Sequence, residues 1–278
     1  MTSATLPQPL KRAAGELLAR LQDGHLGGVV RGAAFVMGIR IAGAVVALLS
    51  QVMLARWLGA FEYVIFSYVW VWVIVLGIIV PMGFGTSVLR FIPEYRTKER
   101  WARLAGFIRT SFGVVLGVSC IAAAAGLLLL WAVQGHIESH YVLPLAVGLL
   151  CVPAFAVTDW QEGVARAFGW VNLAYIPPYI IRPLLIVGAA GGILYFTGGA
   201  TGLQVALGAL AASVVTMAGQ RLYFICRVAR TVPKAKPVYH AKFWIAASAP
   251  LVLVEGLYLL MTNTDIVLLG YFADPDDV

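Results

Sequence analysis

Charged side chains are scarce in this sequence of 278 residues. They make up 12% of it, whereas hydrophobic residues make up 61%, and the mean hydropathy is +0.88. An ordinary soluble domain is about 25% charged. A water-soluble fold of this length needs far more Lys, Glu and Asp on its surface than the chain holds. The composition therefore argues against a soluble enzyme, a nucleic-acid-binding protein and a disordered linker.

Residues that carry out chemistry are also few. The three cysteines, Cys120, Cys151 and Cys226, lie in apolar stretches without C-x-x-C spacing, which argues against a disulfide framework or a zinc site. The sequence contains no G-x-S-x-G, P-loop, H-E-x-x-H or G-x-G-x-x-G motif. His136 and His140 have helical spacing but no evident third ligand. We therefore expect no enzyme, no metal site and no organic cofactor.

Long uncharged runs are what the sequence does contain. There are 27 uncharged residues between Glu62 and Arg90, and 28 between Arg109 and Glu138. A helix needs about 20 mostly apolar residues to cross a membrane. The runs predict an all-α, polytopic membrane protein with seven helices, over residues 32–55, 63–84, 107–133, 142–163, 172–196, 202–225 and 243–270.

The basic residues lie almost entirely on one side of these helices. Of the 20 Lys and Arg residues, 17 precede the first helix or fall in the second, fourth and sixth connections, whereas Arg56 alone faces the other side. Cytoplasmic loops carry such an excess, so the N-terminus is predicted to be cytoplasmic. The net charge of +7 then reflects these loops and not a nucleic-acid partner.

The same pattern divides the chain into four parts. We expect a cytoplasmic amphipathic N-terminus over residues 1–31, a six-helix unit over 32–226, a basic cytoplasmic linker over 227–242 and a seventh helix within 243–278. Residues 10–21 and 91–108 mix apolar and basic side chains. Basic amphipathic stretches of this kind lie along lipid head groups, so we expect contact with anionic membrane lipids.

Three charged residues are predicted to lie inside the membrane. A rise of 1.5 Å per residue from the predicted cytoplasmic helix starts places Arg40, Arg182 and Glu255 roughly 12, 15 and 18 Å deep, near the midplane. A charge there costs at least about 2.5–3.5 kcal/mol unless it meets a partner or an aqueous cavity. Arg182, flanked by prolines, is predicted either to contact a ligand or to pair with Glu255. Arg40 either contacts a ligand or extends to the cytoplasmic surface.

Other polar and aromatic residues leave two interpretations each. Asp265 lies near the outer end of the seventh helix, as either a coupling-ion group or a solvated helix end. Trp70 and Trp72, in the middle of the second helix, either stack on a sugar ring or pack in the core. Glu162 and Arg166 are four residues apart at a helix end, so we expect them to pair.

Two short segments resemble a known family. The sequence A-R-W-L-G-A-F-E-Y over residues 55–63, then P-M-G-F-G-T-S over 81–87 and a basic loop, resembles the oligosaccharide-lipid flippases. These form the polysaccharide-exporter branch of the multidrug/oligosaccharidyl-lipid/polysaccharide superfamily. Val64 stands where that family commonly has Gly. Residues 264–270, T-D-I-V-L-L-G, resemble the start of the family's second lobe.

The resemblance implies a V-shaped, two-lobed transporter of the bacterial inner membrane. This chain would hold the six-helix N-terminal lobe and the first helix of the second lobe, and we expect it to continue past Val278 or to pair with a second copy. The cargo would be an undecaprenyl-pyrophosphate-linked oligosaccharide, moved by alternating access from the cytoplasmic to the periplasmic leaflet for O-antigen, capsule or exopolysaccharide synthesis. A proton or sodium gradient would drive it, beside polysaccharide polymerase and export machinery.

Within that transporter, Arg40 and Arg182 would hold the pyrophosphate, since arginine suits phosphate oxygens. Two other functions stay open. A multidrug cation antiporter has the same fold, although a cationic cargo favours an acidic cavity. A scaffold of a polysaccharide synthase complex would transport nothing itself.

Overall fold

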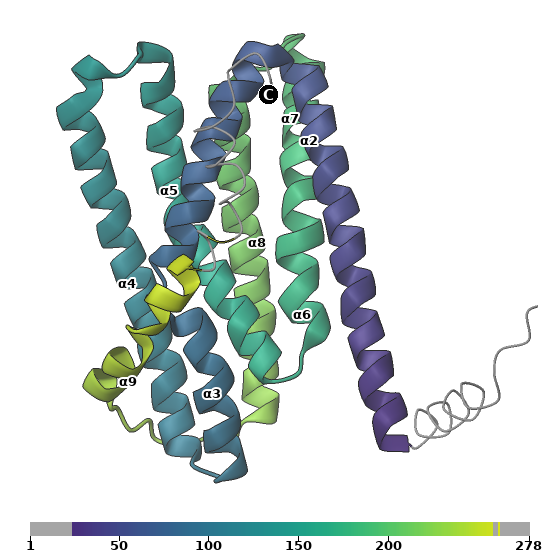
Figure 1. Cartoon of the computed structure of the whole chain (residues 1–278), viewed down its shortest axis with the longest axis vertical. Helices are drawn as coiled ribbons and strands as arrows, with labels where there is room; N and C mark the ends of the chain where they lie inside the picture. The colour runs from purple at the N-terminus through teal and green to yellow at the C-terminus, as the bar shows by residue number, and fades with distance from the viewer. Residues whose placement is uncertain (1–23, 258–260, 262–278) are drawn as a thin grey trace, which may run out of the picture.

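The computed structural model describes residues 24–257 and 261, and side chains from residue 30 onward (Figure 1). Within that part the chain forms helices joined by turns and contains no strand. The predicted amphipathic residues 1–23 and Asp265 lie outside the described part. The elements are α2 (Gly24–Ile79), α3 (Phe84–Thr97), α4 (Trp101–Val133), η1 (Gln134–His136), α5 (Ser139–Ala167), α6 (Val171–Ile176), η2 (Pro177–Ile181), α7 (Arg182–Thr197), α8 (Gly202–Thr231) and α9 (Ala241–Ser248), and residues 251–257 are also helical.

Helix α2 is bent into two limbs at Gly59. Its φ of 76° and ψ of 170° are accessible to glycine and avoided by residues with a Cβ. Across the bend the Tyr63 hydroxyl donates a hydrogen bond to Gln51 Oε1 at 2.6 Å. The two limbs correspond to the first and second predicted helices, over residues 32–55 and 63–84.

Five segments of the described chain are long and apolar enough to span a membrane. The first, Val30–Thr97, includes the bend at Gly59, and the others contain α4, α5, the run from α6 to α7, and α8. The prediction of an all-α polytopic membrane protein is confirmed.

The turns gather at two ends of the bundle (Figure 1). One end, which we call the short-loop end, holds the bend at Gly59, the η1 turn and the turn at Gly198. The other, which we call the basic end, holds the α3–α4 turn, the α5–α6 turn and the end of α8. The connections that carry the excess of Lys and Arg therefore meet at one end, as the sequence predicts.

Helix α5 is the centre of the bundle, because it packs against α2, α3, α4 and α8. Small residues allow the closest approaches. Gly163 of α5 faces the carbonyl of Gly85 in α3, where no side chain would fit. Trp160 of α5 is fully buried among the aromatic side chains of α4 and α8.

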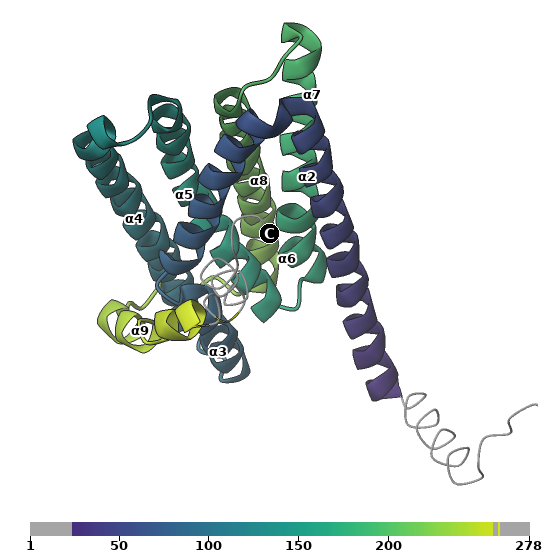
Figure 2. The same ribbon diagram turned by 45° about the horizontal axis from the view of Figure 1, so that its top comes forward.

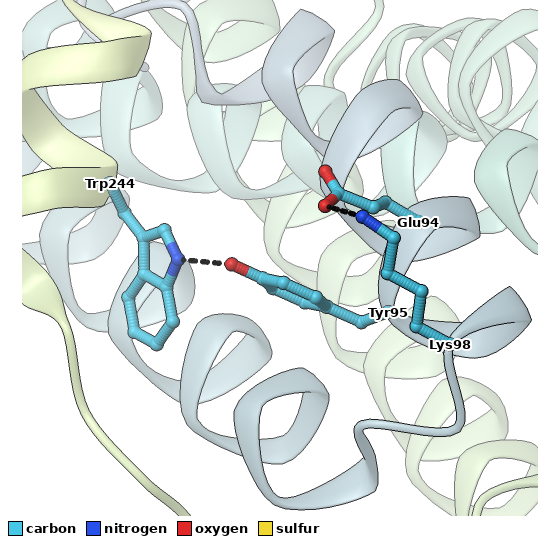
Figure 3. A network of polar contacts seen from close by, with 4 residues as sticks. All are labelled: Glu94, Tyr95, Lys98 and Trp244. Atoms are coloured by element: carbon cyan, nitrogen blue, oxygen red, sulfur yellow. Dashed lines mark hydrogen bonds and ion pairs between the residues drawn. The ribbon is translucent and has the colours of Figure 1, made fainter.

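Helix α9 docks on α3 and α4, as both views show (Figure 1, Figure 2). Trp244 is fully buried and donates its indole N–H to the Tyr95 hydroxyl at 2.9 Å (Figure 3). Ser248 Oγ donates to Ser87 Oγ at 2.8 Å. Ahead of α9, the Val238 N–H bonds the carbonyl of Ala102 at 3.0 Å. Helix α8 continues to Thr231, five residues past the predicted boundary, and the segment that follows is held against α4.

The same docking corrects one expectation. The apolar side chains of residues 91–108 do not lie along lipid head groups but pack into the core with Trp244; they are Phe91, Ile92, Tyr95, Leu104, Phe107 and Ile108. Basic residues remain on the outside, and Lys98 pairs with Glu94 at 2.7 Å on α3 (Figure 3). The amphipathic pattern therefore reflects a helix hairpin covered by α9.

The fourth spanning segment, Val171–Thr197, is interrupted by a π-helical turn before Arg182. Pro177 has no N–H, so the carbonyl of Leu173 loses its helical donor. Gln220 of α8 replaces that donor, with Nε2 at 2.8 Å from Leu173 O. The Arg182 N–H bonds the carbonyl of Pro177, five residues back. The helix thus continues past the prolines with a bulge, and α8 satisfies the exposed carbonyl.

Candidate functional site

Charged residues from four segments meet between the helices towards the basic end. The first limb of α2, α5, the run from η2 to α7 and the helical residues 251–257 contribute to this group, which we call the mixed-charge cluster. Its members are Arg40, Asp159, Glu162, Arg166, Tyr179, Arg182 and Glu255. It holds three arginines and three carboxylates.

Glu162 connects the cluster. It is 8% exposed, and its Oε1 lies 3.7 Å from Arg166 Nη1, so the predicted pairing of these two residues is confirmed. Arg40 and Arg182 also act on Glu162 electrostatically, and Tyr179 is a hydrogen-bonding neighbour. The pair is therefore part of a larger network and not an isolated helix-end contact.

Arg182 lies against an aromatic ring. Its Cζ is 4.1 Å from the centre of the Phe155 ring, within the range of a cation–π contact. Tyr179, Glu162 and Asp159 are its electrostatic neighbours. The bulge at Pro177 immediately precedes Arg182 and directs α7 away from the cluster toward the short-loop end.

Glu255 is not the partner of Arg182. Its Oε1 accepts a hydrogen bond from Thr86 Oγ1 at 2.8 Å, and Arg166 is the cation that acts on it. The expected Arg182–Glu255 pair is therefore wrong. The error arose because helical counting gives a depth along the bundle but not the direction in which each side chain points.

Arg40 joins the cluster from the first limb of α2. Its Cζ lies 5.3 Å from the centre of the Tyr175 ring. One turn later, Gly43 allows η2 to approach α2, because a Cβ there would lie 2.8 Å from Tyr179 Cβ. The contact between α2 and η2 brings Arg40 and Arg182 to the same carboxylate, Glu162.

The cluster lies closer to the basic end than the midplane position that we expected. At a rise of 1.5 Å per residue, Arg40 lies about 28 Å from Gly59, which marks the short-loop end of α2. By the same count, Arg182 lies about 22 Å from Thr197, which marks that end of α7. The apolar core of a bilayer is about 30 Å thick. The helices run several residues beyond their apolar stretches, so depths counted from predicted helix starts were misplaced.

The two candidate tryptophans point to different places. Trp70 contacts Phe155 edge-on, with ring centres 6.2 Å apart, and so borders the ring that supports Arg182. Trp72 is 46% exposed and contacts Tyr68. Residues two apart on a helix point in nearly opposite directions. The structure therefore places Trp70, and not Trp72, beside the cluster.

Asp159 is the member that sequence reasoning missed. A Cβ added at Gly85 of α3 would lie 2.9 Å from Asp159 Oδ2. The glycine at this position therefore makes room for the carboxylate. The spacing of Asp159, Glu162 and Arg166 by three and four residues is the signal that one helix face carries all three. From the sequence we place these residues at the cytoplasmic end of the fourth predicted helix and expect only the Glu162–Arg166 pair.

Arg40 and Arg182 give the cluster two guanidinium groups whose N–H donors can bond to an anion. In residues 30–257, no ion pair or hydrogen bond engages the guanidinium groups of Arg40 and Arg182, so their donors are available. Within the same range no group of His, Cys, Asp and Glu side chains is placed to hold a metal ion. The arrangement suits reversible binding of a phosphate-bearing ligand.

These features define a multi-pass α-helical membrane protein with charged residues enclosed among its spanning helices. A sequence model of the family described as polysaccharide biosynthesis protein matches residues 29–278, and the chain belongs to this family. The match agrees with the predicted resemblance to the polysaccharide-exporter and flippase superfamily. No curated protein and no solved structure matched the chain.

Proposed function

We propose that the protein is a transporter that moves an undecaprenyl-pyrophosphate-linked oligosaccharide between the leaflets of the bacterial inner membrane. Membership of a polysaccharide biosynthesis family and the multi-pass architecture support a role in transport and not in catalysis. The cargo is the precursor of a cell-surface polysaccharide, handed on to polymerase and export machinery. Movement occurs by alternating access, with a proton or sodium gradient as the source of energy.

The observation that carries this proposal is the pair of unoccupied arginines in the mixed-charge cluster. Arg40 and Arg182 come from different spanning segments and share the neighbour Glu162. A pyrophosphate carries several negative charges, and two guanidinium groups can bind it through paired hydrogen bonds. When no cargo is bound, the carboxylates of the cluster balance the arginines. Trp70 and Phe155 provide apolar and aromatic surface beside them.

Replacing Arg182 tests the role of the cluster. In cells that lack their own copy of the gene, Arg182→Ala should reduce export of surface polysaccharide by about tenfold or more, because a charge-assisted contact to the cargo is lost. Lipid-linked precursor should accumulate, and Arg182→Lys should restore export only partly. Arg230→Ala, at the exposed end of α8, is the matched control and should keep full export. Full export by Arg182→Ala at normal abundance would contradict the proposal.

A second measurement in the same cells separates transport from scaffolding. If deletion of the gene stops polysaccharide synthesis without accumulation of lipid-linked precursor, the protein is a scaffold of a synthase complex. The transport proposal is supported if lipid-linked precursor accumulates in the deletion strain, if wild-type protein reverses this accumulation, and if Arg182→Ala does not.

Orientation is tested by thiol labelling. The excess of Lys and Arg places the basic end in the cytoplasm. In a variant whose native cysteines are replaced by serine, Ser139→Cys at the short-loop end should react with an impermeant thiol reagent in intact cells. Lys236→Cys should react only after lysis. Both positions are exposed, so the reverse pattern would overturn the orientation.

The carboxylates favour one alternative, a multidrug cation antiporter. Asp159, Glu162 and Glu255 give the cluster as many acids as arginines, whereas sequence counting had placed one glutamate there. Such an antiporter would expel a cationic dye from energised cells, and Glu162→Gln would abolish the efflux. Under the flippase proposal, dye accumulation is the same with and without the protein.

A further inference from the structure

Arg221 lies in an aromatic cage on the other side of α5. It projects from α8, and its Cζ is 3.9 Å from the centre of the Phe112 ring of α4. The ring centres of Trp160 and Phe224 lie 5.8 and 5.7 Å from the same atom. Because α4 and α8 both pack against α5, Arg221 bridges the groove between them.

No counter-charge accompanies this arginine. In the described part of the chain, no carboxylate acts on Arg221 and no hydrogen bond engages it. Its Nη1 is buried without an acceptor. The next arginine on α8 differs, since Arg227 Nη1 lies 3.2 Å from the Tyr223 hydroxyl. The Arg221 side chain is half-buried, and a buried N–H without an acceptor is costly, so the cage suits an anion or another acceptor from outside.

A second unpartnered donor belongs to the same cage. Trp160 is fully buried, and its indole Nε1 has no hydrogen-bond acceptor within the described residues. Its ring centre lies 5.8 Å from Arg221 Cζ, so the two unpartnered donors belong to neighbouring side chains. A donor pair of this kind, N–H of tryptophan beside guanidinium, fits an oxygen-rich anion such as phosphate.

The cage lies at the depth of lipid head groups. Counted from Gly202, Arg221 is about 28 Å from the short-loop end, and counted from Val133, Phe112 is about 32 Å from it. Both distances match the thickness of the bilayer core, about 30 Å. The phosphates of the leaflet at the basic end therefore lie level with this groove.

The surroundings suit a whole phospholipid. On α8, the residues next to Arg221 on the outer surface are apolar and exposed, with Leu222 67% and Ile225 50% accessible. Acyl chains can lie along them. On α4, the exposed Arg109 precedes Phe112 by one turn and adds positive charge on the side of the basic end.

We propose that Arg221 and Trp160 form a binding site for the phosphate of an anionic membrane phospholipid, in the groove between α4 and α8. Arg221 donates to the phosphate oxygens, the Trp160 indole N–H donates to the same group, and the rings of Phe112 and Phe224 shield the contact from water. The site uses none of the residues of the mixed-charge cluster, so it does not depend on the proposed cargo.

Native mass spectrometry of the purified protein tests the site. The protein is equilibrated with equal amounts of phosphatidylglycerol and phosphatidylcholine in detergent, and the bound lipids are counted. Wild-type protein should retain phosphatidylglycerol over phosphatidylcholine by about tenfold. Arg221→Gln should abolish that preference, and Trp160→Phe, which keeps the ring and removes the N–H, should reduce it by about threefold. Arg227→Gln, the matched control on the same helix, should leave it unchanged.

Each further result has a defined meaning. Equal preference in wild type and Arg221→Gln overturns the site. If Arg221→Gln does not yield folded protein, Trp160→Phe decides, and an unchanged preference in that variant overturns the proposal. A parallel sample contains inorganic phosphate at millimolar concentration. Loss of phosphatidylglycerol in that sample overturns the assignment to a lipid, whereas retention supports it.

Discussion

Two adjacent residues of α5 lead to two different arginine environments. Asp159 faces the mixed-charge cluster, where Arg182 Cζ lies 4.1 Å from the Phe155 ring. Trp160 faces the aromatic cage, where Arg221 Cζ lies 3.9 Å from the Phe112 ring. The contact with an aromatic ring is nearly the same in both. The difference is that Asp159 and Glu162 act on Arg182, whereas no carboxylate of the described residues acts on Arg221.

The two environments show that one helix can border a site whose arginines are neutralised by carboxylates and another site whose arginine is not. A cation–π contact contributes about 0.5–2 kcal/mol, which is less than the cost of removing a guanidinium group from water. In the mixed-charge cluster, attraction to the carboxylates offsets the rest of this desolvation cost. The cluster is therefore stable without a ligand. In the cage, no carboxylate of the described residues contributes such an attraction. Stability should therefore depend on acidic residues in one region and on packing in the other.

The largest expected effect is on packing in the cage. Trp160→Ala removes a fully buried indole that contacts both Phe112 and Phe224, and it should lower the free energy of unfolding by about 3–5 kcal/mol. Thermal denaturation in detergent measures the loss. Trp72→Ala is the matched control, since that side chain is 46% exposed, and it should cost much less. Equal costs would show that the cage is not a packing centre.

A smaller effect is expected in the mixed-charge cluster. Glu162→Gln removes the carboxylate shared by three arginines and should lower the free energy of unfolding by about 1–3 kcal/mol. The double variant Glu162→Gln with Arg166→Gln should recover part of that loss, because fewer cations are left without a partner. Strictly additive losses in the double-mutant cycle would show that the two residues are not coupled.

The smallest effect is expected at the exposed surface of α3. Lys98 pairs with Glu94 at 2.7 Å, but its side chain is 52% exposed. Lys98→Ala should therefore change the free energy of unfolding by about 0.2–0.5 kcal/mol, and less at high salt. If Lys98→Ala lowers the free energy of unfolding as much as Glu162→Gln does, burial does not explain the difference between the Lys98–Glu94 and Arg166–Glu162 pairs.

Most of the fold was predictable from the uncharged runs. The first six predicted helices lie within the five segments that are long and apolar enough to span a membrane, because lipid leaves the backbone no other way to satisfy its hydrogen bonds. The seventh, predicted over residues 243–270, is interrupted by a turn at residues 249–250, and its second half lies largely outside the described part. The connection between residues 55 and 63 was predicted, but its form as a bend at the single residue Gly59 was not, and neither was the docking of Trp244. The first depends on one backbone conformation, and the second on a contact between residues 149 positions apart.

The candidate site was predictable only in part. Arg40, Arg182 and Glu255 were recognised because charges in apolar runs are conspicuous, and all three lie in the mixed-charge cluster. Asp159 and Glu162 were assigned to a helix end because they follow an apolar run, although α5 continues past them. The partner of Arg182 was assigned wrongly, because counting from predicted helix starts misplaced the depths and gives no direction for a side chain.

The bond from Gln220 to the carbonyl of Leu173 bears on how the protein is made. The donor lies 47 residues after the acceptor, so the acceptor is synthesised first. Until α8 enters the membrane, the carbonyl freed by Pro177 has no donor within its own helix and is poorly suited to lipid. The segment from α6 to α7 and helix α8 should therefore leave the insertion machinery together, as a pair. We expect a Gln220→Leu variant, which lacks this donor, to slow the release of the interrupted helix into the bilayer.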